Sequence, residues 1–183
     1  MFGINQALKK NKLKMKKILL ILVAALGLTA TAQTGFKKSD KFVEGSVSYT
    51  KVKDVDATYT IAPAVGYFLT DKTAVGVSLS TTKNVTNTTS VGVFARHYFL
   101  NAGQNFKVYS QLGVNTNSAT DVKSYVKADL GLGLNYFVTK NLALTTSLTS
   151  LASYNDQTST FTVGFTGVDN PFSKTTFGAI YKF

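Results

Sequence analysis

The sequence predicts an all-β fold: an eight-stranded antiparallel transmembrane β-barrel of up-and-down topology, preceded by a cleaved signal peptide. Three observations predict it, namely a strand-forming composition, alternating polarity after residue 33, and an aromatic closing segment. The 183 residues include 13 Phe, 9 Tyr and 14 Gly but only 2 Pro. Aromatic residues favour strands, and a chain of this length favours a single domain.

The closing segment, residues 175–183, shows the alternation expected of a lipid-facing strand. Because side chains alternate between the two faces of a strand, Phe177, Tyr181 and Phe183 share one face. Lys182 belongs to the other face, which is otherwise small or aliphatic. In a barrel closed within a membrane, the aromatic face meets lipid and the final aromatics lie at the interface. We therefore expect this segment to be the strand that closes the barrel.

The N-terminal segment has the three parts of a secretory signal peptide. Two lysines precede an apolar run at 18–28, and small residues follow the run. The run is shorter than the roughly 20 apolar residues of a transmembrane helix. We expect a signal peptide at 1–32, cleaved between Ala32 and Gln33, with Met15 as an alternative start of translation.

The formal charge of +11 by itself suggests a nucleic-acid partner, but the distribution of the charges along the chain does not support one. Six of the 20 basic residues lie before residue 18, and no acidic residue occurs in the first 32. The remaining segment has 14 bases (20 − 6) and all 9 acids, a net charge of +5. We therefore expect no nucleic-acid partner. Because the chain has no Cys, it has no disulfide, thiolate metal site or lipoprotein acylation site.

A short polar lead at 33–40 is followed by a domain at 41–183 in which alternating segments are separated by turn residues. The clearest alternation lies at 124–138, where branched apolar residues face away from Lys127 and Asp129. No helical periodicity occurs after residue 33. We expect eight strands, at 41–53, 57–69, 73–83, 88–100, 106–117, 124–138, 142–154 and 173–183.

A sequence repeat supports the hairpin arrangement. Residues 66–75 and 135–144 each end a strand on Tyr-Phe, turn tightly and begin another strand, and a looser copy starts at Tyr98. Three short turns on one side are typical of transmembrane barrels. Two features oppose the pattern: Pro63 removes a backbone donor in mid-strand, and 161–167 looks like a ninth strand. We interpret 161–167 as an extension of the last hairpin or as an ordered outer loop.

These features together resemble the small OmpA/OmpX-type family of outer-membrane β-barrels, in a Bacteroidetes-like style. The resemblance rests on the signal peptide, the Tyr-Phe turns, residues 94–99 and residues 177–183, and it covers the mature chain. It implies location in a Gram-negative outer membrane, contact with its lipid, and insertion by the secretion and barrel-assembly machinery. The lead and the short turns would be periplasmic. It also implies a C-terminal assembly signal, here Phe177, Tyr181 and Phe183.

Charged residues with the inward phase are expected to line the lumen. A Lys or Arg that faces lipid at the membrane midplane costs roughly 2–4 kcal/mol. In a narrow interior, opposite charges should pair, because an unpaired buried charge is costly. Charges near the rims would instead be solvated. The expected lumen polar network consists of Glu44, Arg96, Lys107, Lys127 and Asp129.

The sequence offers no catalytic, cofactor or metal site. His97 is the only histidine, and its outward phase near a rim favours an interface position. Gly131-Leu132-Gly133 lacks the third glycine of a dinucleotide-binding loop, and no acidic cluster suggests a metal. We therefore expect no cofactor and no enzymatic activity.

We expect a monomeric outer-membrane protein with a structural or surface-interaction role through its outer loops, its surface partner being unknown. The first alternative is a narrow passive porin, because inward Gly and Ser residues leave room for water. The second is a secreted soluble barrel that binds a small apolar ligand. That barrel would require apolar residues inside and polar residues outside.

Overall fold

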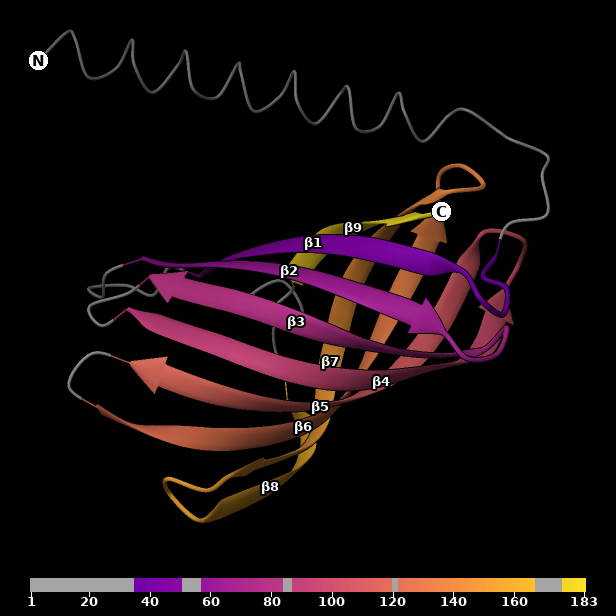
Figure 1. The fold of residues 1–183 in the computed structure, drawn as a ribbon. Helices are drawn as coiled ribbons and strands as arrows, with labels where there is room; N and C mark the ends of the chain where they lie inside the picture. The colour runs from indigo at the N-terminus through magenta and orange to yellow at the C-terminus, as the bar shows by residue number, and fades with distance from the viewer. Residues whose placement is uncertain (1–34, 51–56, 84–86, 120–121, 167–175) are drawn as a thin grey trace, which may run out of the picture. The chain divides into compact units, whose positions relative to one another are not determined.

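The computed structural model describes residues 35–50, 57–83, 87–119, 122–166 and 176–183. The expected signal peptide and its cleavage site, between Ala32 and Gln33, lie outside these residues. Within them, nine strands form one sheet (Figure 1), and no helix is long and apolar enough to cross a membrane. The strands are β1 (Lys41–Thr50), β2 (Thr58–Phe68), β3 (Thr73–Lys83), β4 (Thr88–Ala102), β5 (Phe106–Ala119), β6 (Val122–Phe137), β7 (Leu142–Asn155), β8 (Thr160–Thr166) and β9 (Thr176–Lys182).

Eight of the nine strands close the sheet on itself. Each strand from β1 to β7 pairs antiparallel with the next, and β9 pairs with both β7 and β1. The closing β1–β9 ladder runs from Phe42 opposite Lys182 to Val47 opposite Phe177. This topology confirms the eight-stranded up-and-down barrel. Because the barrel is closed, each wall strand is hydrogen-bonded to a neighbour on both sides. A β-structure in lipid requires this, since no water is present to bond an open edge.

Strand β8 lies outside the closed ring. Among the described strands it pairs only with β7, through residues 150–155 of that strand, whereas β9 pairs with residues 142–147. Because β7 serves two partners in succession, β8 extends the last hairpin beyond the level at which β9 closes the wall (Figure 1). Of the two interpretations of 161–167, the hairpin extension is confirmed.

The outward face of the wall is apolar. The outward Tyr59 and Tyr67 lie near the two ends of β2, and the segment from one to the other, both included, has nine residues (67 − 59 + 1). That length matches the roughly 9–11 residues with which a tilted strand crosses the hydrocarbon core. An apolar exterior is the reverse of what the soluble-barrel alternative requires. Exposed aliphatic side chains continue this belt on β2 itself and on β1, β3, β4 and β5, at Val43, Val47, Ile61, Val65, Val75, Val77, Val91, Val93, Leu112 and Val114.

The three short turns lie at one end of the barrel, which we call the short-turn end. In two of them a threonine hydroxyl accepts the backbone N–H three residues later: Thr70 from Thr73 and Thr139 from Leu142, both at 3.0 Å. The third turn instead contains Gly103, whose φ of 76° lies in the left-handed region that favours glycine. The repeat in the sequence therefore encodes one turn geometry used twice.

Pro63 lies at a local break in strand pairing. On one side it is opposite Gly45 of β1. On the other side, the β2–β3 register passes from Ile61 opposite Thr81 directly to Ala64 opposite Ser78. A residue without a backbone N–H fits such a break, because no ladder donor is required there.

Candidate functional site

The centre of the lumen contains a buried ion pair between two strands. Arg96 of β4 and Glu44 of β1 both point inward, and Nη1 of Arg96 lies 2.9 Å from Oε2 of Glu44. Their side chains are only 3% and 11% exposed. Nε of Arg96 also donates to Oε1 of Gln111 on β5, at 2.8 Å. The guanidinium therefore joins three strands through one side chain.

Two tyrosines extend this arrangement, which we call the Arg96 network. The Tyr98 hydroxyl accepts from Nδ2 of Asn135 at 2.8 Å and from Nη1 of Arg96 at 3.4 Å. The Tyr109 hydroxyl shares a hydrogen bond with that of Thr145 at 3.2 Å. Cζ of Arg96 lies 4.3 Å from the centroid of the Tyr109 ring, within cation–π range. Polar bonds and ring faces thus surround a charge that the lumen would otherwise leave poorly solvated.

Below the network, toward the short-turn end, aromatic rings fill the lumen. Phe36 belongs to the lead, yet it is only 6% exposed. Its ring stacks on Phe68 at 4.3 Å, lies 4.9 Å from Tyr98, and meets Phe137 edge-on at 5.0 Å. Phe42 lies 5.6 Å from Phe68. We call these five side chains the aromatic plug.

The lead is fixed to the barrel by several bonds. The backbone N–H of Ser39 donates to the Phe68 carbonyl at 2.8 Å, and the N–H of Phe68 donates to the Asp40 carbonyl at 2.9 Å. The carboxylate of Asp40 forms an ion pair with Nζ of Lys182 on β9, at 2.9 Å. Because these bonds hold both strand ends and the lead, Phe36 is positioned by backbone contacts as well as by ring packing.

Above the network, toward the far end, the lumen opens into a cavity of about 370 Å³. Its lining is dominated by small hydroxyl and amide side chains on six strands. Asp129 accepts from Nδ2 of Asn115 at 3.3 Å, and Lys127 also borders the cavity. The other polar lining residues are Glu44, Ser46, Ser48, Thr60, Ser78, Ser80, Thr82, Ser90, Arg96, Gln111, Asn117 and Thr176.

The five residues of the expected lumen network are only partly brought together. Glu44 and Arg96 form the central pair, and Lys127 and Asp129 line the cavity above it. Lys107 is separate: its Nζ donates to Oδ1 of Asn101, an exposed partner close to the β4–β5 turn, at 2.9 Å. The inward phase alone therefore does not place Lys107 in the central network. Lys107 is the second residue of β5, so its side chain lies at the rim of the barrel.

The alternation pattern does not predict the aromatic plug. The composition of the lead indicates only a polar segment and assigns no role to Phe36. The signal was present, since Phe36 is a lone aromatic among polar residues directly before the first strand. Tyr98 was likewise read as part of a turn, although its inward phase places it beside Arg96.

Two glycines make room for the inward rings. A Cβ added to Gly66 would overlap the ring of Phe42, and one added to Gly133 would overlap the ring of Tyr109. Both rings are buried. Glycine is therefore required at these positions by close approach of a side chain and not by backbone conformation.

The outward residues have the positions expected at a lipid interface. Phe177, Tyr181 and Phe183 are all exposed on β9 and just beyond it. His97 is also exposed, and its Nδ1 lies 3.0 Å from the Thr73 hydroxyl. Within the described ranges, no group of three or more His, Cys, Asp or Glu could hold a metal ion. The exposed aromatic residues make the outer surface best suited to contact with lipid.

No protein-family model and no curated protein matches the chain. The crystal structure of the N-terminal β-barrel domain of Pseudomonas aeruginosa OprF does match, with a TM-score of 0.57 and 18% identity. The match covers 80% of this chain and 98% of that domain. The chain therefore shares the closed eight-stranded β-barrel fold of that domain.

Two further solved structures align with this barrel at lower similarity. Pseudomonas aeruginosa OprG has 15% identity, with 81% of this chain and 98% of OprG covered. Neisserial surface protein A has 17% identity, with 79% and 96% covered. Both have a TM-score of 0.49. The assignment of the fold rests on the OprF domain and on the closed eight-stranded topology.

Proposed function

We propose that the protein is a non-enzymatic, monomeric outer-membrane barrel with a closed lumen, acting as a structural element and a surface-interaction scaffold. The observation that carries the proposal is the Arg96 network directly above the aromatic plug. Its partners would be outer-membrane lipid, the secretion and barrel-assembly machinery during biogenesis, and a surface molecule of unknown identity. The short-turn end would then be periplasmic, and the far end would face outward.

The closure argument combines barrel size with packing. Eight strands enclose a lumen just wide enough for side chains to fill it. Here Phe36, Phe68 and Phe137 are all buried at one level, and Arg96 is buried at the next. A solute that passed through would have to displace stacked rings and break a buried ion pair. Such losses cost several kcal/mol, so a static opening is disfavoured.

The surface role is supported by the β7–β8 hairpin. This hairpin extends past the closed ring, and its outward Phe161 and Val163 are strongly exposed. It is the described part of the far end that is most accessible to a partner. Proximity labelling on intact cells, with a label fused next to Asp156 in the hairpin turn, would identify neighbours at the cell surface.

A narrow porin is the second candidate, and the cavity of about 370 Å³ favours it. Small polar residues line the far half of the lumen, so water could enter from that side. The cavity ends at Arg96 and Phe94, however, above the aromatic plug. Under the closed-lumen proposal it is a dead end and not one half of a channel.

Planar-bilayer recordings of the purified barrel test the closure. The wild type is expected to give no reproducible unit conductance. A variant that combines Phe36→Ala with Arg96→Ala removes one ring of the aromatic plug and the arginine of the buried ion pair. It is expected to conduct, and its conductance would show that inserted barrels are detectable. Heat-modifiable gel mobility checks that both proteins are folded. Defined unit steps from the wild type would favour the porin instead.

A further inference from the structure

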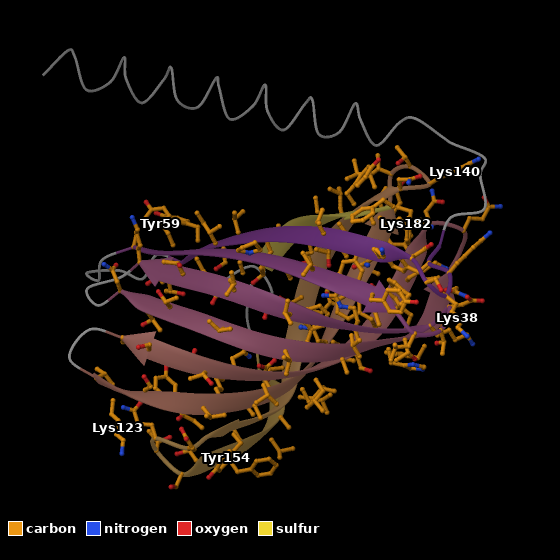
Figure 2. The ribbon with its side chains drawn as sticks, viewed as in Figure 1. Lys38, Tyr59, Lys123, Lys140, Tyr154 and Lys182 are labelled. Carbon is orange, nitrogen blue, oxygen red and sulfur yellow. The ribbon has the colours of Figure 1, made fainter. Side chains whose placement is uncertain are left out.

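The short-turn end carries a ring of lysines, which we call the basic rim. Lys37 and Lys38 lie in the lead, whereas the other members lie in turns or at strand ends. Lys38, Lys140 and Lys182 are labelled at this end in Figure 2, and Lys123 is labelled at the opposite end. The basic rim consists of Lys37, Lys38, Lys41, Lys72, Lys107, Lys140 and Lys182.

The basic rim accounts for all of the excess charge of the barrel segment. Residues 33–183 carry 14 bases and 9 acids, a net charge of +5. The rim has seven lysines and only two acids, Asp40 and Asp71, which is also +5 (7 − 2). The remaining seven bases (14 − 7) and seven acids (9 − 2) cancel. The net charge of the basic rim therefore equals that of the whole segment.

Most of these lysines form no ion pair with another described residue. Lys182 is paired with Asp40, and Lys107 donates to Asn101. The carboxylate of Asp71 accepts the backbone N–H of Lys38, at 2.7 Å. The side chains of Lys37, Lys38, Lys41, Lys72 and Lys140 form no ion pair with any other described residue. All five are exposed.

The basic rim adjoins the lipid-facing belt at Lys41. Lys41 is opposite Tyr67 on the outward face, and its backbone exchanges two hydrogen bonds with Phe183, at 3.2 and 2.9 Å. Tyr67, Phe183 and Phe99 are exposed aromatics of the same end. Aromatic residues at this position mark the level of the lipid headgroups. The lysines therefore lie at or just beyond the headgroup layer.

We propose that the basic rim binds the headgroups of anionic phospholipids in the leaflet that surrounds the short-turn end. A positive ring at this level attracts anionic lipid, and long lysine side chains can reach the phosphates while their stems stay on the apolar surface. The proposal rests on the proposed membrane location, with the short-turn end in the periplasm. It adds a lipid specificity that a closed, anchored barrel does not require.

Spin-labelled lipids provide the test, because the fraction of motionally restricted label measures which lipids contact the protein. The full barrel is reconstituted in phosphatidylcholine with traces of spin-labelled phosphatidylglycerol or spin-labelled phosphatidylcholine. We expect a preference of roughly two- to fivefold for phosphatidylglycerol at low salt. The preference should disappear near 1 M salt, where the Debye length is about 3 Å.

A matched pair of variants locates the effect. Lys72→Gln with Lys140→Gln removes two of the five unpaired lysines of the basic rim and should clearly weaken the preference. Lys83→Gln with Lys123→Gln removes the same charge from the far end and should leave the preference unchanged. An equal loss in both variants would contradict the proposal, because net charge and not the rim would then be responsible.

Other outcomes also decide the question. A wild-type protein that inserts but shows no headgroup preference would overturn the lipid proposal and leave the closed-barrel proposal intact. Failure to insert into phosphatidylcholine at all would count against the membrane function itself. Binding of soluble polyglutamate to the detergent-solubilised barrel, without any preference for phosphatidylglycerol, would assign the rim to a soluble polyanion instead.

Discussion

Phe36 stacks on Phe68 with their ring centroids 4.3 Å apart, although only Phe68 belongs to a strand of the barrel wall. A residue from outside the wall thus completes the aromatic plug. The contact also links the lead to the β2–β3 turn, which follows Phe68 directly. Closure of the short-turn end therefore depends on the lead being present and folded.

Replacing Phe36 with Ala should destabilise the barrel by about 3 kcal/mol, because the ring is buried among other aromatics. Urea unfolding in lipid vesicles, followed by the loss of heat-modifiable mobility, measures the change. Lys37→Ala provides the control, since Lys37 is exposed and should change stability by less than about 0.5 kcal/mol. Equal effects of the two substitutions would argue that the lead, and not the ring, is responsible.

Glu44→Gln should cost about 3–5 kcal/mol, because it leaves the Arg96 guanidinium buried without its counter-charge. Adding Arg96→Gln in the same protein should recover part of the loss, since no lone charge then remains. The same unfolding assay gives the coupling energy from the double-mutant cycle. Additive losses would show that the two side chains act independently, contrary to the ion pair.

Gly133→Ala should lower stability by about 1–3 kcal/mol, because its methyl group would overlap the buried Tyr109 ring. The displaced tyrosine should also lose its hydrogen bond to Thr145. Gly45→Ala on β1 is the matched control, since nothing lies within 4 Å of its added Cβ. Unfolding midpoints of the two variants provide the comparison, and a larger loss at Gly45 would contradict the packing argument.

Replacing Tyr181 and Phe183 with Ser should reduce the amount of inserted barrel far more than the amount synthesised. Both side chains face outward on the strand that joins β7 to β1. Heat-modifiable mobility of membrane fractions, set against total protein, separates insertion from expression. Thr176→Ser, on the inward face of the same strand, should have little effect. If insertion were unaffected by the double change, these aromatics would not be an assembly signal.

Signal cleavage remains a prediction, with the mature chain expected to begin at Gln33. Small residues at positions 30 and 32 fit the cleavage pattern. The intact mass of the protein from the envelope fraction measures it directly. A mass that includes residues 18–28 would disprove the cleavage.

The wall could be predicted from the sequence because alternation and turn residues are local signals. The lipid-facing phase of β9 follows from Phe177 and Tyr181 alone, and the turns follow from Thr70 and Thr139. The plug could not be predicted in this way, because Phe36 meets rings from three strands that are distant in sequence. Alternation predicts the face of the strand on which a side chain lies, but not its level along the barrel axis.

The ion pair between Asp40 and Lys182 joins residues 142 positions apart. The β1–β9 ladder beside it has a similar span, so both contacts form only after the intervening strands have been brought into place. Contacts of such long sequence separation slow folding, because the loop entropy is lost before they contribute. The contact between Asp40 and Lys182 is therefore expected to form late, together with wall closure. A fluorophore near Lys182 would report this phase, which should be slower than the first appearance of β-structure.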